Sequence, residues 1–141
     1  MGKKIVITGG IGYIGTELCK IYSGYSWNDK ITVIDNRFIS ERVNQLRNWN
    51  MNFVHGDILD KDLIKKYCQD ADVVHHLAGI TAVPRVKSEA NEEKEKEIER
   101  VAKEGTQNIL DVISDKCKIV MPSTHVVYEG MKDVQEDILE N

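Results

Sequence analysis

Cysteine is scarce in this sequence, and no hydrophobic run is long. The 141 residues include three cysteines, Cys19, Cys68 and Cys117, which are odd in number and widely separated. They match neither a disulfide framework nor a zinc-binding pattern, so we expect reduced, mostly buried thiols in a cytoplasmic protein. No apolar stretch approaches the length of a membrane span, and the apolar run after Met1 is too short for a signal peptide.

A large excess of charge is also missing. The formal net charge of −4 at pH 7 provides no general attraction to nucleic acid or to acidic membranes, so we expect neither as a partner. Apolar residues make up 41% of the chain, which is enough to form the core of one domain spanning residues 1–141. No internal repeat or low-complexity linker interrupts it.

Short β-branched runs alternate with helical patterns along the chain. We predict five strands, at residues 4–8, 30–34, 52–55, 72–77 and 118–121. Several are unbroken apolar cores, as expected of parallel strands covered on both faces. Alternation of strands and helices with right-handed crossovers predicts an α/β fold with a doubly wound parallel sheet in the order 3-2-1-4-5. Its ligand crevice is expected above the carboxyl ends of strands 1 and 4.

Helical spacing of apolar residues predicts a helix after the first strand and another after the third. The first carries an apolar stripe and has Gly24 near its end. The other runs from about Leu63 to Ala71, with Asp60 placed to cap its start. The stripe of the first helix consists of Ile14, Leu18, Ile21 and Tyr22.

The longest helix is predicted from Ser88 to Ser114. Its first half, residues 89–97, is almost entirely polar, which indicates a solvated face supported by i,i+4 ion pairs such as Glu92/Lys96 and Glu99/Lys103. An acidic docking surface is the alternative interpretation. Its second half is predicted to present the following residues to the core: Ile98, Val101, Ala102, Ile109, Leu110 and Ile113.

A glycine-rich loop, residues 8–15, joins the first strand to the first helix. Gly9 can take the positive φ of a tight turn, Gly12 lets the backbone approach a pyrophosphate, and Gly15 lets the helix pack closely on the sheet. A phosphate there would meet free N–H groups and the positive end of the helix dipole. The alternative is that the glycines only serve a turn.

Asp35 ends the second strand, 20 residues after Gly15 (35 − 15 = 20). A carboxylate there can accept hydrogen bonds from ribose hydroxyls and repel a 2′-phosphate, which favours NAD over NADP. Arg37 lies close enough to pair with such a phosphate, so the choice stays open. The alternative for Asp35 is a simple turn residue at the end of a strand.

The spacing of the three glycines resembles that of the extended short-chain dehydrogenase/reductases, the NAD-dependent epimerase/dehydratase family. Further segments match in order: residues 35–36 (ribose), 56–58 (adenine), 76–79 (cofactor loop), 105–108 (small-residue motif) and 123–128 (active-site segment). The resemblance spans nearly the whole chain and implies a Rossmann-type domain with NAD as its cofactor. It implies these cofactor-binding residues: Gly9, Gly12, Tyr13, Ile14, Gly15, Asp35, Asn36, Asp57, Ile58, Leu77, Ala78 and Gly79.

The resemblance also implies a catalytic chemistry. In this family a tyrosine phenolate, with its pKa lowered by a lysine four residues later, removes a hydroxyl proton from a sugar. Thr124 occupies the position of the Ser or Thr that holds that hydroxyl, although it could be an ordinary strand-end residue. The Tyr-x-x-x-Lys pair is expected about 25 residues beyond Thr124, past Asn141. The string at residues 128–132 is rejected because Gly130 disfavours the helix that the pair requires.

The chain is therefore expected to be an incomplete module that lacks the catalytic helix and the substrate domain. The resemblance implies the NAD-binding portion of a nucleotide-sugar epimerase or oxidoreductase, which transfers hydride at a sugar carbon. The nucleotide sugar would bind the full-length protein, with dimerisation through helix 88–114. A stand-alone, non-catalytic redox sensor that binds a dinucleotide is the alternative.

Two other readings are disfavoured. Dehydratases of this family carry Asp-Glu after the active-site Thr, whereas this sequence has His125 and Val126 there. A metal site at His75 and His76 is not expected, because adjacent strand residues point to opposite faces.

Overall fold

The fold is taken from a computed structural model that describes residues 2–25, 28–81 and 92–123. Strands and helices alternate along the chain. Their order is β1 (Lys4–Thr8), α1 (Tyr13–Tyr25), β2 (Lys30–Asp35), α2 (Ser40–Asn48), β3 (Asn52–His55), α3 (Lys61–Cys68), β4 (Val73–His76), α4 (Glu92–Leu110) and β5 (Lys118–Val120).

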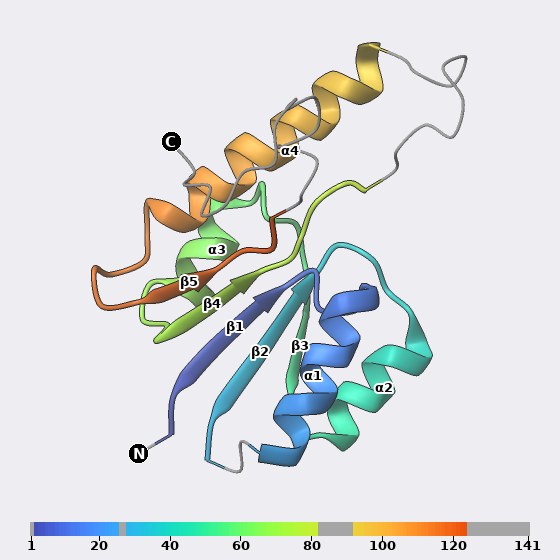
Figure 1. Ribbon diagram of the computed structural model, residues 1–141, viewed down its shortest axis with the longest axis vertical. Coiled ribbons are helices and arrows are strands. Elements are labelled where there is room, and N and C mark those ends of the chain that lie inside the picture. The colour runs from blue at the N-terminus through green and yellow to red at the C-terminus, as the bar shows by residue number, and fades with distance from the viewer. Residues whose placement is uncertain (1, 26–27, 82–91, 124–141) are drawn as a thin grey trace, which may run out of the picture.

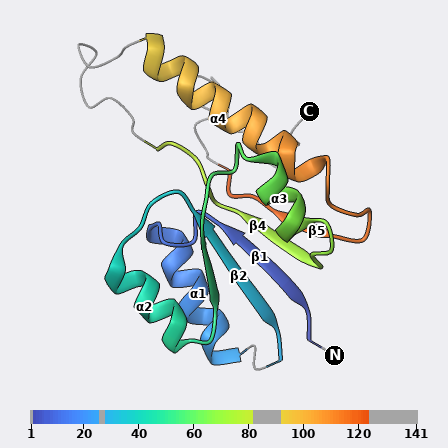
Figure 2. The ribbon, with the colours of Figure 1, turned by 180° about the vertical axis from the view of Figure 1, so that it is seen from behind.

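The five strands form one parallel sheet in the order β3-β2-β1-β4-β5. The predicted fold class and strand order are therefore confirmed. Helices α1 and α2 lie on one face of the sheet, and α3 and α4 lie on the other (Figures 1 and 2). Because β1 lies between β2 and β4, its carboxyl end and the loop that follows it are at the middle of the sheet edge.

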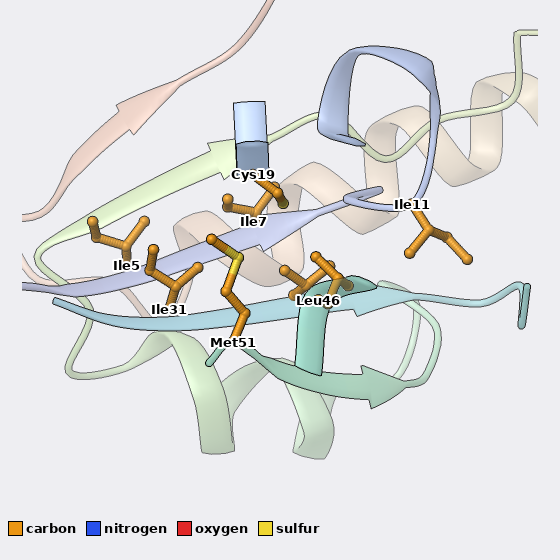
Figure 3. Close-up of a cluster of buried hydrophobic side chains, with 8 residues drawn as sticks. Ile5, Ile7, Ile11, Cys19, Ile31, Leu46 and Met51 are labelled. Carbon is orange, nitrogen blue, oxygen red and sulfur yellow. The ribbon is translucent and has the colours of Figure 1, made fainter. Parts of the chain in front are cut away.

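Alternation along β1 divides the core into two clusters. Ile5 and Ile7 face α1 and α2, in the cluster drawn in Figure 3 with Cys19, Leu46 and Met51. Val6 faces the other side, where Ile64 of α3 and Ile109 of α4 are fully buried. Fully burying a side chain of this kind contributes about 1.5–3 kcal/mol. The two layers therefore hold β1 from both faces.

The rotation of α1 differs from the predicted stripe. Ile14 and Ile21 are 61% and 57% exposed, whereas Gly15 and Cys19 are buried. The start of α1 lies so close to the glycine loop that only small residues fit on its inner face. The predicted helix is confirmed, but the inward orientation of these two isoleucines was wrong.

Helix α4 also departs from the predicted pattern. Ala102 is exposed and Leu110 is 46% exposed, so neither belongs to the core. Gly105 and Asn108 are buried instead, beside Ile109. The helix ends at Leu110, short of Ser114; its predicted start lies outside the described residues.

Two local predictions are confirmed. Asp60 caps α3, where its side chain accepts a hydrogen bond from the backbone N–H of Leu63 at 3.0 Å. On α4, the ion pairs Lys96–Glu92, at 3.8 Å, and Lys103–Glu99 form along an exposed face. Over the described part of the chain, no helix combines the length and the apolar character needed to cross a membrane.

Helix α2 was not located from the sequence. Only Val43 and Leu46 of its nine residues are buried, so its apolar pattern is too sparse to mark a helix. It matters for the site because it carries Arg42.

Candidate functional site

A cleft of about 940 Å³ opens at the carboxyl ends of the central strands. All of the cofactor-binding residues expected from the sequence line it: Gly9, Gly12, Tyr13, Ile14, Gly15, Asp35, Asn36, Asp57, Ile58, Leu77, Ala78 and Gly79. They come from four separate segments of the chain. The parallel sheet brings these segments together, because the carboxyl ends of its strands meet at one edge.

The glycine loop leaves no room for side chains on its inner side. Gly9 has a φ of 71°, and a Cβ there would lie 2.7 Å from the backbone nitrogen of Ala78. A Cβ on Gly15 would lie 2.5 Å from the carbonyl oxygen of Gly9. Gly9 therefore makes the tight turn and Gly15 the close helix packing that were predicted.

The start of α1 suits a bound anion. The Thr16 N–H donates to the Gly12 carbonyl at 3.0 Å. The residues before Thr16 in α1 form the first turn of the helix, in which N–H groups have no partner within the helix. A Cβ on Gly12 would meet the Gly9 oxygen at 3.1 Å, so its absence keeps the cleft open beside these amides. The N–H groups at the start of α1 can donate to a diphosphate, and the absence of a side chain on Gly12 leaves space for it. Tyr13 and Ile14 are 87% and 61% exposed beside it.

Asp35 ties the tip of β2 to the glycine loop. Its side chain is 3% exposed and accepts hydrogen bonds from the backbone N–H of Ile11 at 3.3 Å and of Arg37 at 3.0 Å. The Arg37 Nε also donates to it, at 3.3 Å. On the other side of the loop, the Arg42 guanidinium donates to the Ile11 carbonyl. Arg42 carries no motif signal, and the sequence did not single it out.

Helix α4 positions the part of the cleft predicted to hold adenine. The Asn108 side-chain amide donates to the Ile58 carbonyl at 3.0 Å. A Cβ on Gly105 would lie 2.3 Å from the Ile58 Cδ1 atom, which explains the small residue at that place in the helix. Asp57 accepts from the Leu59 N–H at 2.9 Å and from the Asn36 amide at 3.4 Å.

His76 links β1 to α4 beneath the cofactor loop. Its Nδ1 lies 2.8 Å from the Thr8 hydroxyl, and its Nε2 lies 3.0 Å from the Thr106 hydroxyl. The Thr8 oxygen also accepts from the Ala78 N–H at 3.3 Å, so this hydroxyl contacts both the His76 ring and the loop that follows β4. Burial lowers the pKa of His76, which favours the neutral ring over the imidazolium.

His75 points to the opposite face, where its Nε2 lies 2.7 Å from the Tyr22 hydroxyl. The prediction of two satisfied strand-end histidines is confirmed. Within residues 2–25, 28–81 and 92–123, no three His, Cys, Asp or Glu side chains form a metal-binding group. The partners Thr8 and Thr106 could not be recognised from the sequence, because they are 68 and 30 residues from His76.

Some predicted residues lie outside the described part of the chain. These include Thr124, the proposed catalytic threonine, and Tyr128. The early part of the proposed dimer helix, residues 88–91, lies outside it as well.

Comparison with known proteins identifies the family. The model of the 3-beta hydroxysteroid dehydrogenase/isomerase family matches residues 6–138. The chain belongs to this family of extended short-chain dehydrogenase/reductases. The match confirms the resemblance that was recognised from the glycine spacing and the ordered segments.

Two curated relatives that cover most of this chain are nucleotide-sugar enzymes. UDP-N-acetyl-alpha-D-glucosaminuronate decarboxylase of Bacillus cytotoxicus is 31% identical over 142 residues, which cover 97% of this chain and 41% of the relative. CDP-paratose 2-epimerase of Salmonella typhi is 34% identical, over 92% of this chain and 39% of the relative. The chain thus spans about two fifths of these relatives, and it corresponds to the N-terminal portion of extended short-chain dehydrogenase/reductases.

Solved structures share the fold. The PbgP3 protein of Burkholderia pseudomallei superposes with a TM-score of 0.76 at 26% identity, covering 97% of this chain and 40% of that protein. A UDP-glucose-4-epimerase of Stenotrophomonas maltophila, solved with bound NAD, gives 0.74 at 21% identity, over 93% and 40%. At that identity the second match bears on the fold alone.

Proposed function

We propose that this chain binds NAD in the cleft, as the cofactor-binding portion of a nucleotide-sugar epimerase or oxidoreductase. One observation carries the proposal. Four segments, residues 9–15, 35–36, 57–58 and 77–79, each contribute predicted cofactor contacts and all line a single cleft.

Each part of the cleft suits one part of the dinucleotide. The diphosphate would lie against the amides at the start of α1, where the helix dipole is positive. Asp35 would accept hydrogen bonds from the adenosine ribose, and Asp57 with Ile58 would hold the adenine. The loop 77–79, held by Thr8 and His76, would lie along the nicotinamide half.

The chemistry proposed for the whole protein is reversible oxidation of a sugar carbon. Bound NAD would supply the hydride acceptor. Thr124 would hold the reacting sugar hydroxyl by a hydrogen bond while a basic side chain takes its proton, which leaves a carbonyl on the sugar. Return of hydride and proton completes an epimerisation or, on a different carbonyl, a reduction. Support comes from the nucleotide-sugar relatives named above.

Isothermal titration of the 141-residue chain with NAD and NADH tests the cofactor proposal. We expect saturable binding of one dinucleotide per chain. Gly12→Val should weaken it at least about tenfold, because the added side chain enters the space next to the α1 amides. Gly24→Val is the matched control, since Gly24 lies on α1 in open space away from the cleft. A folded wild-type chain that binds neither form would refute the proposal.

The sugar chemistry needs a separate test. The coding frame beyond Asn141 should contain a Tyr-x-x-x-Lys string, and the protein it encodes should epimerise or oxidise a nucleotide sugar such as UDP-glucose with NAD. Thr124→Val in that protein should lower kcat and leave the affinity for NAD unchanged. A stop codon directly after Asn141, together with NAD binding, would favour the redox-sensor alternative instead.

A further inference from the structure

A second hollow, of about 590 Å³, opens at the edge of the sheet opposite the cleft. It lies where β2 begins and where the turn after α2 leads into β3 (Figure 1). A rise of about 3.3 Å per residue places Lys30, at the start of β2, roughly 16 Å from Asp35 at its end, so the hollow and the cleft are separate. The polar residues that line the hollow are Asn28, Asp29, Lys30, Arg47, Asn50 and Asn52.

Two cations of the hollow have no partner in the described part of the chain. The Lys30 ammonium and the Arg47 guanidinium are exposed, and neither forms an ion pair or a side-chain hydrogen bond there. The hydrogen bond from Lys4 is the first cause of the lowered pKa of Asp70, and the charge of Lys30 adds to it. The Asp70 carboxylate is therefore already paired, and both cations of the hollow can donate to an anion.

The location of Arg47 has a structural explanation that leaves its donors unused. Arg47 lies in the last turn of α2, where a positive charge is favourable beside the negative end of the helix dipole. That effect needs only the charge. The five N–H donors of a guanidinium are still available for a ligand.

The remaining polar groups suit hydroxyls better than charges. The side-chain amides of Asn28, Asn50 and Asn52 form no hydrogen bond with any residue that the structure describes, and an amide can both donate to a hydroxyl and accept from one. Asp29 accepts the Lys3 backbone N–H on Oδ1 at 2.8 Å, so its other oxygen can accept from a ligand hydroxyl. A ligand of the hollow therefore combines an anionic group with hydroxyl groups.

We propose that this hollow binds a small phosphorylated polyhydroxy compound, a sugar phosphate by chemical class. Lys30 and Arg47 would hold the phosphate, and the asparagine amides and Asp29 would hold the hydroxyls. A guanidinium matches two phosphate oxygens, and an ammonium acts as a point charge. The proposal concerns a site away from the cleft and does not depend on NAD binding.

The charge of a phosphate monoester matches the two cations better than a carboxylate does. Such a group carries about −1.5 to −2 at pH 7, whereas a carboxylate carries −1 and would leave one cation without a partner. The volume of the hollow lies within the range of about 300–1,000 Å³ that is usual for small-molecule sites. It therefore has room for the hydroxyl-bearing part of the ligand as well as for the phosphate.

The exposure of both cations sets the strength of binding. Exposed ion pairs are weak and are screened by salt, so we expect a Kd of about 1 mM at low ionic strength. The affinity should fall when the ionic strength is raised to about 0.15 M.

Titration of glucose 6-phosphate into the ¹⁵N-labelled 141-residue chain, followed by NMR, tests the proposal. The backbone amides of residues 28–31 and 47–52 should shift and saturate with a Kd of about 1 mM. Glucose should cause no saturable shift at the same concentrations, because it lacks the charge. Inorganic phosphate should bind at least about threefold more weakly, because it has no sugar hydroxyls to contact the amides.

Matched variants assign the contacts. Arg47→Gln and Lys30→Gln should each weaken glucose 6-phosphate about three- to tenfold. Lys61→Gln removes the same charge from an exposed residue of α3, on the opposite face of the sheet (Figures 1 and 2), and should leave the affinity unchanged. Gly12→Val, in the cleft, should leave it unchanged too. The NMR spectrum of each variant verifies that it is folded.

Several results would overturn the inference. Saturable shifts confined to residues 9–15 would place the phosphate at the start of α1, and no saturable shift in the folded chain would mean that the hollow binds no sugar phosphate. An equal loss of affinity in Lys61→Gln and Arg47→Gln would show general charge attraction. Inorganic phosphate that binds as tightly as glucose 6-phosphate would rule out the hydroxyl contacts.

The failure of this inference can be distinguished from the failure of the proposed function. Arg47 does not line the cleft, so Arg47→Gln should bind NAD as wild type does. Wild type that binds NAD but no sugar phosphate leaves the cofactor proposal intact. Wild type that binds sugar phosphate in the hollow but no dinucleotide refutes the cofactor proposal alone.

Discussion

Replacing Gly15 by alanine should destabilise the fold, whereas the same replacement at Gly24 in the same helix should stabilise it. Both glycines lie in α1, where alanine ordinarily adds about 0.5–1 kcal/mol through backbone entropy. No heavy atom of the described chain, apart from its own helix backbone and neighbours, lies within 4 Å of a Cβ added at Gly24. Gly24→Ala should therefore raise the free energy of unfolding by that amount.

The situation at Gly15 is the reverse. An added Cβ would lie 2.5 Å from both the Gly9 oxygen and the Gly10 Cα, which are backbone atoms of the glycine loop. Ordinary contact begins at 3.4 Å, so the loop or the helix start must move by about 0.9 Å (3.4 − 2.5). Overpacking of this kind costs about 1–3 kcal/mol, which exceeds the gain from alanine. We expect a net loss of about 0.5–2 kcal/mol.

Urea denaturation followed by circular dichroism measures both variants under one condition. Because each change affects the unfolded chain in the same way, the difference between the two variants isolates the contact in the folded state. The slope of the unfolding free energy with urea should match wild type, which confirms that a single transition is compared. Gly15→Ala as stable as Gly24→Ala would show that the loop does not pack on α1 as described.

Two further predictions concern buried groups. Burial lowers the pKa of His76 from its usual value of about 6.5, so the unfolded chain binds a proton that the folded chain resists. The stability contributed by the neutral ring is therefore complete above about pH 6.5 and is lost as the pH falls. His76→Gln should make the free energy of unfolding depend less on pH in this range. If the free energy of unfolding of the variant falls with pH as steeply as that of wild type, His76 is not buried as described. Burial raises the pKa of Cys19 and Cys68 to about 12, so a thiol reagent at about pH 8 should modify Cys117 first in the folded chain. Cys117→Ser should remove that first phase, and rapid labelling that persists would refute the burial of the other two thiols.

The strand order, the glycine loop and Asp35 could be predicted from the sequence pattern, and the resemblance to the family implied the other residues of the cleft. Each strand is a short apolar run, and alternation with helices leaves few topologies once crossovers are right-handed. Gly9, Asp35 and Asp57 each follow or end a strand, so the topology alone brings them to one edge. These are properties of residues close together in the chain.

Only the tertiary structure decided which face of each helix is buried and which side chains form hydrogen bonds with one another. Ile14 faces outward because the glycine loop excludes all but a small residue, Gly15, from the inner face of α1. The spacing of apolar residues in α1 could not reveal this, because the excluded volume belongs to the loop as folded against β4. The sequence also did not reveal helix α2, because it buries too few apolar residues to produce a helical pattern.

For the polar contacts of the site, too, the sequence determined some features and the tertiary structure determined others. The sequence by itself determined that a carboxylate ends β2 and that an arginine follows two residues later. Only the fold determined that the arginine closes over the carboxylate and reaches Gly12, and that His76 bridges Thr8 and Thr106. Local patterns depend on neighbours in the chain, whereas these contacts depend on segments that meet only when the sheet has formed.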